Sequence, residues 1–276
     1  MYSTGSFYNS RGLEIFYQSW FPERQMKALC FISHGYAEHG GRYAHVGEYL
    51  SKEGIGVTAL DHQGHGRSQG IRADIKKFEF FLHDVDKLIE IIREEHPDVP
   101  FFLFGHSMGG GIAAVYATQH QEKFNGVILS GPAVKVGADV SPLLKRVSGF
   151  LSVVAPNLGV LPFEAEQISR DPKVVEAYKA DPLVYHGKMK ARLGYNLLRV
   201  ESLFKEKAVY CRLPVLCMHG TADKLVEPAS SQMVYDSVGS RDKTIHFWEG
   251  LYHELVNEPE QEHVLQMVLE WIKERM

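Results

Sequence analysis

The sequence predicts an α/β protein with a mostly parallel central sheet, flanked by helices and interrupted once by a helical insertion. Between Ala28 and Gly131, short apolar runs alternate with longer amphipathic stretches, which is typical of βαβ units. From about 132 to 208 this alternation stops, and helix-type apolar residues and prolines dominate without clear strands. The strand pattern then returns. We therefore expect a core made of residues 1–131 and 209–276, and a helical cap made of residues 132–208.

Six apolar runs are expected to be strands, because they are short and rich in β-branched or aromatic residues. They are ALCFISH (28–34), GVTALD (56–61), FFLFG (101–105), GVILSG (126–131), LPVLCMHG (213–220) and KTIHFWEG (243–250). Helices are expected over 78–96, where apolar residues recur at helical spacing, over 111–120, and over the closing amphipathic stretch 263–276.

The composition excludes several classes of protein. The 276 residues carry 30 basic and 34 acidic side chains, and the basic ones are scattered, so we expect no nucleic-acid partner. Cys30, Cys211 and Cys217 are odd in number and lie in apolar surroundings, which favours reduced core residues over disulfides. No basic leader precedes an apolar run, and no stretch of about 18 apolar residues lacks a charge. We expect a cytoplasmic protein.

The segment GHSMGG (105–110) lies between the strand FFLFG and a helix-forming stretch. A Gly-x-Ser-x-Gly string in a strand-turn-helix setting is the nucleophile elbow of many hydrolases. A β-carbon at position 105 or 109 would collide with neighbouring backbone, which explains why glycine is needed there. The pattern therefore predicts Ser107 as a nucleophile. A simple Gly-rich helix cap is the alternative.

A serine nucleophile needs a histidine base and an acid that orients it, in the chain order Ser, Asp or Glu, His. Asp223 lies just after the strand 213–220, and His253 lies just after the strand 243–250, so both are expected at the same sheet edge. Other late histidines fit less well. His219 and His246 fall inside strand patterns, and His263 belongs to the last helix.

Acyl transfer also needs donors for the oxyanion, normally the backbone N–H after the nucleophile and one from the loop after an earlier strand. Here these are the amides of Met108 and Tyr36, the latter in SHGYAEHGGRY (33–43). In the same loop, Glu38 and Arg42 form either a buried pair that fixes the loop or a solvated pair.

The segment DHQGHGRSQG (61–70) brings Asp61, His62 and His65 together, but we expect no metal there. Asp and Gly after a strand form turn hydrogen bonds, and no second ligand cluster completes a coordination shell.

Taken together, these segments resemble a known family. The chain is similar, almost from end to end, to the monoacylglycerol lipases and their lysophospholipase-like relatives, which are serine hydrolases of the α/β-hydrolase fold. The strings that carry the resemblance are SHGYAEHGGRY, LDHQGHGRS, LFGHSMGG, YKADPLVYHG, GTADKLV and DKTIHFWEGLYHELVNE. Single motifs are common to all α/β-hydrolases, whereas the set is specific to this group.

The resemblance implies hydrolysis of a monoacylglycerol to glycerol and a free fatty acid, through an acyl-enzyme on Ser107 and without a cofactor. His253 would be the general base and acid, and Asp223 would orient it. The amides of Tyr36 and Met108 would bind the oxyanion. The family commonly has a small residue where Tyr36 stands, but the role needs only the backbone N–H.

The resemblance also implies binding roles around the pocket. Tyr178 would lie near the glycerol end, and Glu38 and Arg42 are further candidates for substrate binding. The insertion 132–208 would be the family's lid, with apolar helices that line a tunnel for the acyl chain and touch membrane lipid transiently.

Several alternatives share these residues. A lysophospholipase, a general carboxylesterase or a thioesterase would use the same three side chains, and the sequence does not separate them. Outside the enzymes, a lipid-binding protein on the same scaffold is the alternative. Tight lipid binding without covalent labelling by a fluorophosphonate would identify it.

Overall fold

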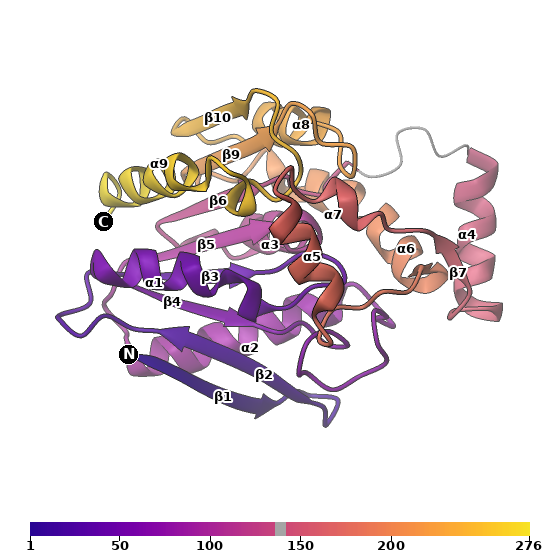
Figure 1. Cartoon of the computed structure of the whole chain (residues 1–276), viewed down its shortest axis with the longest axis horizontal. Coiled ribbons are helices and arrows are strands. Elements are labelled where there is room, and N and C mark those ends of the chain that lie inside the picture. The colour runs from indigo at the N-terminus through magenta and orange to yellow at the C-terminus, as the bar shows by residue number, and fades with distance from the viewer. Residues whose placement is uncertain (136–141) are drawn as a thin grey trace.

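An eight-stranded sheet forms the centre of the computed structural model, which describes residues 1–135 and 142–276 (Figure 1). The strands lie in the order β1-β2-β4-β3-β5-β6-β9-β10, and all neighbours from β4 onward are parallel. They are β1 (Tyr2–Tyr8), β2 (Glu14–Trp20), β3 (Ala28–Ser33), β4 (Ile55–Leu60), β5 (Phe101–His106), β6 (Gly126–Ser130), β9 (Val215–Gly220) and β10 (Lys243–Trp248). The mostly parallel sheet that the sequence predicts is confirmed.

All six predicted strands are present, with ends that differ from the prediction by one or two residues. β3, β4, β5, β6 and β9 are buried along their whole length, as expected for strands covered on both faces. The sequence analysis missed β1 and β2, which pair antiparallel and extend the sheet beyond β4.

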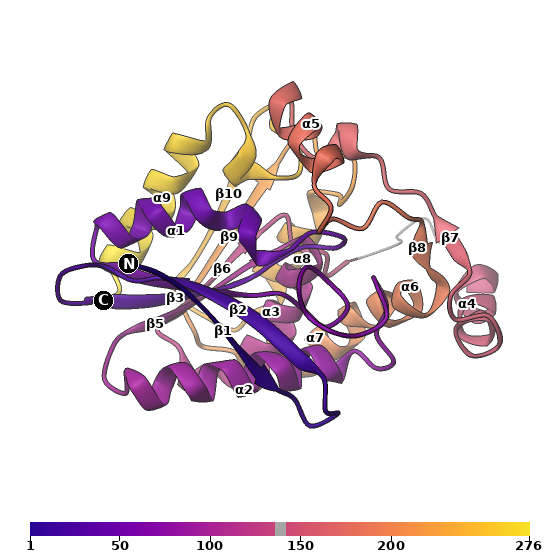
Figure 2. The same cartoon turned by 60° about the horizontal axis from the view of Figure 1, so that its bottom comes forward.

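Helices cover both faces of the sheet (Figure 2). α1 (Ala44–Lys52) and α9 (Gln261–Lys273) pack on one face, whereas α2 (Glu79–Glu95), α3 (Ser107–Gln119) and α8 (Ala229–Ser237) pack on the other. The three predicted helices correspond to α2, α3 and α9. The apolar positions that predicted α2, among them Phe81, Val85 and Leu88, are buried against the sheet.

The segment between β6 and β9 extends from one end of the sheet (Figure 1). It contains the helices α4 (Pro142–Val154), α5 (Pro172–Ala180), α6 (Ala191–Leu198) and α7 (Val200–Ala208). The expectation of an insertion without strands was wrong in one detail, because β7 (Gly159–Leu161) and β8 (Met189–Lys190) form a small antiparallel pair. No helix within the described residues is both long and apolar enough to cross a bilayer.

Polar contacts attach this segment to the loop after β4. Arg192 holds Asp74 through two hydrogen bonds, one of them 3.0 Å long from Nε to Oδ1. The side-chain amide of Asn196 donates to the Ile75 carbonyl at 3.0 Å, and Arg72 donates to the Leu183 carbonyl at 2.6 Å. The segment is therefore fixed to the core by side chains as well as by its two chain connections.

We expect Arg192→Ala to lower the free energy of unfolding by about 2 kcal/mol, because it leaves the buried Asp74 carboxylate without its partner. Denaturant unfolding measures the change. Lys205→Ala is the control, since it removes an exposed ion pair to Glu201 and should change stability by less than about 0.5 kcal/mol. Equal effects of the two substitutions would contradict the attachment.

Candidate active site

Ser107 lies where the chain turns from β5 into α3. Its φ is +53°, in the left-handed region that serine rarely adopts. Close backbone contacts require glycine on both sides. A Cβ on Gly109 would lie 2.1 Å from the Ser33 carbonyl oxygen, and a Cβ on Gly105 would lie 2.6 Å from the Gly109 carbonyl oxygen. The sequence argument for glycine at these two positions is confirmed.

Asp223 and His253 come together from the loops that follow β9 and β10. His253 Nδ1 lies 2.6 Å from Asp223 Oδ2, and both side chains are buried. Asp223 Oδ1 accepts the N–H groups of Leu225 at 2.8 Å and Val226 at 3.0 Å. Because a carboxylate only accepts, His253 donates from Nδ1 and keeps Nε2 free to take a proton.

The environment adjusts the proton affinity of both groups. Burial acts to raise the pKa of Asp223, but His253 and His219 outweigh it and hold that pKa below its usual range. Burial acts to lower the pKa of His253, but the Asp223 carboxylate outweighs it and raises that pKa. The pair therefore combines an ionised acid with a base of increased proton affinity.

Ser107 and His253 line the same cavity, which has a volume of about 300 Å³. One wall comes from the segment between β6 and β9 and is largely apolar, and another comes from the loop that carries Asp223. The lining residues are Tyr36, Ser107, Met108, Ala133, Lys135, Leu161, Pro162, Phe163, Met189, Leu197, Lys224, Leu225, Val226, Glu227 and His253. The cavity thus presents polar atoms at Ser107 and an apolar wall beside them.

Tyr36 and Met108 carry the two backbone N–H groups that the sequence analysis selected. Met108 is the second residue of α3, and N–H groups of a first helical turn have no acceptor within the helix. Tyr36 lies in the loop after β3, and its N–H donates to no acceptor among the described residues. Two amides are therefore available beside Ser107.

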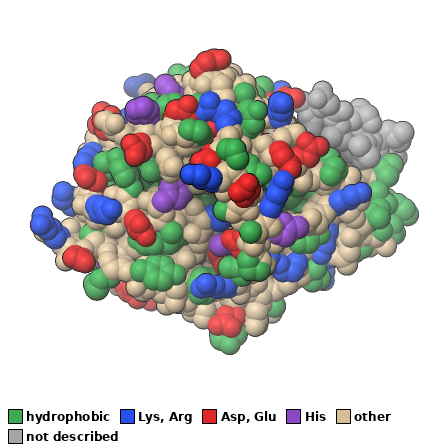
Figure 3. All heavy atoms as spheres, viewed as in Figure 1, with side chains coloured by type: hydrophobic (Ala, Val, Ile, Leu, Met, Phe, Trp, Pro, Cys, Tyr) green, Lys and Arg blue, Asp and Glu red, His purple; other side chains and the backbone are tan. Residues whose placement is uncertain are grey.

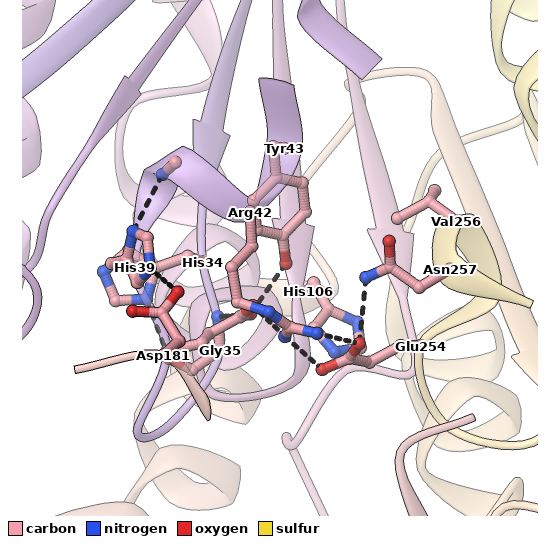
Figure 4. A network of polar contacts seen from close by, with 12 residues as sticks. His34, Gly35, His39, Arg42, Tyr43, His106, Asp181, Glu254, Val256 and Asn257 are labelled. Carbon is pink, nitrogen blue, oxygen red and sulfur yellow. Dashed lines mark hydrogen bonds and ion pairs between the residues drawn. The ribbon is translucent and has the colours of Figure 1, made fainter. Parts of the chain in front are cut away.

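Glu38 and Arg42 form a buried ion pair, so the solvated alternative is wrong. Arg42 lies between two carboxylates, and Figure 4 shows its contact with Glu254. It contacts Glu38 at 2.8 Å and Glu254 at 2.5 and 2.7 Å. Glu38 in turn accepts the Gly35 N–H at 2.6 Å and the Tyr43 hydroxyl at 2.8 Å. These contacts join the loop that contains Tyr36 to the loop that contains His253.

The three side chains expected to bind substrate, Glu38, Arg42 and Tyr178, are not among the residues that line the cavity. Glu38 and Arg42 instead hold the loop of Tyr36 in place through the hydrogen bonds described above. The Tyr178 ring lies 4.7 Å from the Arg42 guanidinium. The sequence analysis missed Glu254. The only signal for it was an acidic residue directly after His253.

Three histidines are buried beneath the loop of Tyr36. His34 Nε2 accepts the His62 N–H at 2.9 Å, and the His34 ring lies 5.5 Å from the His65 ring. Asp61 accepts the N–H groups of Gly40 and Arg67, which are the kind of turn bonds expected for this segment. No group of three or more His, Cys, Asp or Glu within the described residues is arranged to hold a metal ion.

A parallel strand that turns into a helix at a strained serine, with an Asp–His pair at the same sheet edge, is the arrangement of the serine hydrolases of the α/β-hydrolase fold. Fold and site together place this chain in that class.

Comparisons with known proteins agree with this class. A family model described as Hydrolase_4, serine aminopeptidase S33, matches residues 24–260. The monoacylglycerol lipase of Mycolicibacterium smegmatis is 41% identical over 98% of this chain and 96% of its own. The monoglyceride lipase of Mus musculus is 35% identical over 97% and 89%. The crystal structure of a monoacylglycerol lipase from Paleococcus ferrophilus superposes with a TM-score of 0.85 and 30% identity over 95% and 99%. The chain therefore belongs to the serine aminopeptidase S33 family of serine hydrolases.

Acid should destabilise the fold through its buried histidines. Burial lowers the pKa of His34 and of His65 to about 3, and that of His106 to about 4. In the unfolded chain these side chains protonate near pH 6.5. Their contribution is therefore complete above pH 6.5, and as the pH falls toward 4 each removes up to about 1.4 kcal/mol of unfolding free energy per pH unit.

Denaturant unfolding at several pH values between 7 and 4 measures this dependence. His65→Gln should reduce the slope by about one proton, whatever its effect on stability at pH 7. His263→Gln, on the exposed face of α9, should leave the slope unchanged. A slope that is the same in His65→Gln and in the unmodified chain would show that His65 is not kept neutral by burial.

Proposed function

We propose that this chain hydrolyses the ester bond of monoacylglycerols to glycerol and a free fatty acid, with Ser107 as nucleophile, His253 as general base and acid, and Asp223 as the residue that orients His253. The observation that carries the proposal is the buried contact of 2.6 Å between Asp223 and His253 at a cavity that also contains the strained Ser107. The names of the relatives reported above support the substrate.

The first half of the reaction forms an acyl-enzyme. His253 Nε2 takes the hydroxyl proton as Ser107 Oγ attacks the ester carbonyl carbon, and Asp223 stabilises the imidazolium that results. The N–H groups of Tyr36 and Met108 stabilise the negative charge that develops on the carbonyl oxygen. The imidazolium then gives its proton to the glycerol oxygen as the carbon–oxygen bond breaks.

The second half releases the acid. His253 takes a proton from water, the hydroxide attacks the acyl carbonyl, and the same two amides stabilise the second oxyanion. When the bond to Ser107 Oγ breaks, His253 returns the proton to the serine. The cycle uses only these side chains, two backbone amides and water.

The apolar wall of the cavity suits an acyl chain. Leu161, Phe163, Met189 and Leu197 all come from the segment 132–208, which we propose as the cap over the site. Tyr178 packs on Phe163, with ring centroids 5.9 Å apart, and its buried hydroxyl has no partner among the described residues. Because Tyr178 does not line the cavity, it acts on the apolar wall through Phe163 rather than by direct contact with the alcohol.

The outer surface of this cap suits contact with a membrane. Hydrophobic side chains gather at the right-hand edge of the molecule in Figure 3, where Figure 1 places α4 and β7. The exposed apolar patch consists of Val147, Phe150, Val153, Val154, Leu158, Val160 and Leu161. Leu161 also lines the cavity, so the patch leads directly to the site. An exposed apolar patch of this kind marks a contact with either lipid or protein. Because the proposed substrate is a lipid, we favour contact with a membrane.

Ser107→Ala should abolish release of fatty acid from a long-chain monoacylglycerol, with a loss in kcat on the order of 10⁵–10⁶. Ser51→Ala, in α1 away from the cavity, is the control and should keep full activity. The matching lysophospholipid is assayed in parallel. Preference for it, or for simple esters or thioesters, would replace the proposed substrate and keep the nucleophile. Tight lipid binding without turnover or fluorophosphonate labelling would indicate a lipid-binding protein.

Replacing Phe150 and Val153 by serine should weaken binding to phosphatidylcholine vesicles at least about tenfold, because it removes two of the most exposed apolar side chains of the patch. Vesicle co-sedimentation measures binding. Tyr210→Ser is matched for exposure, 67% against 66% for Phe150, lies outside the patch and should bind as the unmodified chain does. Hydrolysis of a water-soluble ester should be unchanged in all variants. Undiminished vesicle binding by the Phe150/Val153 variant would refute the membrane contact.

A further inference from the structure

A second buried histidine contacts the carboxylate of Asp223. His219 lies in β9, four positions before Asp223, and its Nε2 is 3.1 Å from Asp223 Oδ2. The same nitrogen lies 2.9 Å from the Val226 carbonyl oxygen, and Nδ1 lies 2.7 Å from the Ser231 hydroxyl oxygen in α8. Both His219 and Ser231 are fully buried. This histidine therefore connects β9, α8 and the loop that carries Asp223.

The partners of His219 define where its proton lies. A carbonyl oxygen can only accept, so Nε2 carries the hydrogen that faces both Val226 and Asp223. The other ring nitrogen, Nδ1, forms a hydrogen bond with the Ser231 hydroxyl. One N–H is thus shared between a carbonyl and a carboxylate, and Ser231 holds the ring in the orientation that allows this.

We propose that His219 is a positioning residue for the hydrolysis proposed above, because its Nε2–H donates to the carboxylate oxygen that also accepts from His253. The inference rests on that function, in which Asp223 orients His253. Asp223 Oδ1 is saturated by two backbone N–H groups, whereas Oδ2 receives both histidines. His219 therefore holds the one oxygen on which the orientation of His253 depends.

The contact has a consequence for the proton affinity of His253. A hydrogen bond donated to a carboxylate stabilises its charge and reduces its ability to attract a proton through a second partner. Loss of the His219 donor should therefore strengthen the pull of Asp223 on His253 and raise the pKa of His253. Loss of the donor should also let Asp223 Oδ2 move, so that His253 Nε2 is less well oriented toward Ser107.

The pKa of His253 reports on the His219 contact only if the charges of the other groups near His253 stay the same. His106, at the end of β5, has its ring centroid 4.6 Å from that of His253, and Glu254 and Glu38 act on His253 through their charges. Arg42 neutralises part of both carboxylates. None of these side chains is a hydrogen-bond partner of His219, so a neutral substitution there leaves their charges in place.

The test compares His219→Leu, which removes the donor, with His219→Gln, whose amide nitrogen reaches the position of Nε2. Hydrolysis of a water-soluble p-nitrophenyl ester is measured from pH 5 to 9, together with fluorophosphonate labelling of Ser107 and thermal unfolding. If the Leu variant does not fold, His219→Asn replaces it, since its shorter amide does not reach Asp223. A further variant, Ser231→Ala, keeps the His219 ring and removes only the hydrogen bond between Nδ1 and the Ser231 hydroxyl.

For the donor-free variant we expect kcat to fall on the order of tenfold with little change in KM, and the acidic limb of the kcat profile to move up by about half a pH unit. The Gln variant should restore kcat to within about threefold of the unmodified chain. It should also return the acidic limb to within about a tenth of a pH unit of its original position. Ser231→Ala should shift the limb in the same direction by a smaller amount.

Three results would overturn the inference. A donor-free variant with unchanged kcat and profile would show that the contact does not act on Asp223. A drop in kcat or thermal stability with an unmoved acidic limb, and no rescue by Gln, would show a purely structural role. If Ser107 of the unmodified chain neither labels nor turns over any ester, the proposed function is overturned, and this inference with it. The first two results overturn the inference alone and leave the proposed function in place.

Discussion

The site depends on one close backbone contact, between the turn that carries Ser107 and the end of β3. Gly109 lies so near the Ser33 and His34 carbonyl groups that no side chain fits between them. The loop with Tyr36 begins at those carbonyls, so this single contact fixes the positions of Ser107 and the Tyr36 amide relative to each other. The Ala133 N–H fixes the turn from the other side by donating to the Ser107 carbonyl at 2.9 Å. Ser107 keeps its left-handed backbone conformation because the close contacts on both sides of the turn exclude other conformations.

Much of this could be predicted from sequence, for a physical reason. β3, β5 and β6 are buried on both faces, so each is a short apolar run that stands out between helices. The order of these elements also brings the residues after β5, β9 and β10 to one sheet edge, which locates Ser107, Asp223 and His253 without any contact being known. β1 is largely exposed and contains Ser and Gly, so it lacks this signal.

The partners of the charged residues could not be predicted, because they are distant in the chain. Arg42 and Glu254 are separated by 212 positions, and their contact exists only once the loops after β3 and β10 meet. Spacing alone allows Glu38 and Arg42 to face solvent, substrate or each other. Their burial decides the matter, since two carboxylates enter the interior only with a guanidinium between them. His219 is similar. Its place in a strand predicts burial, but the contact with Asp223 depends on how the following loop folds back.

These buried charges act together on His253. Asp223, Glu254 and Glu38 each act on His253 through their negative charges, so these carboxylates favour the imidazolium that the proposed reaction forms. His106 lies against the same ring, and burial lowers its pKa to about 4, so it stays neutral and adds no opposing charge. Arg42 lowers the pKa of the buried Glu254 to about 2 against the cost of burial, which keeps that charge in place. Because these groups are fixed by the fold before a substrate arrives, the imidazolium is stabilised without rearrangement during the reaction.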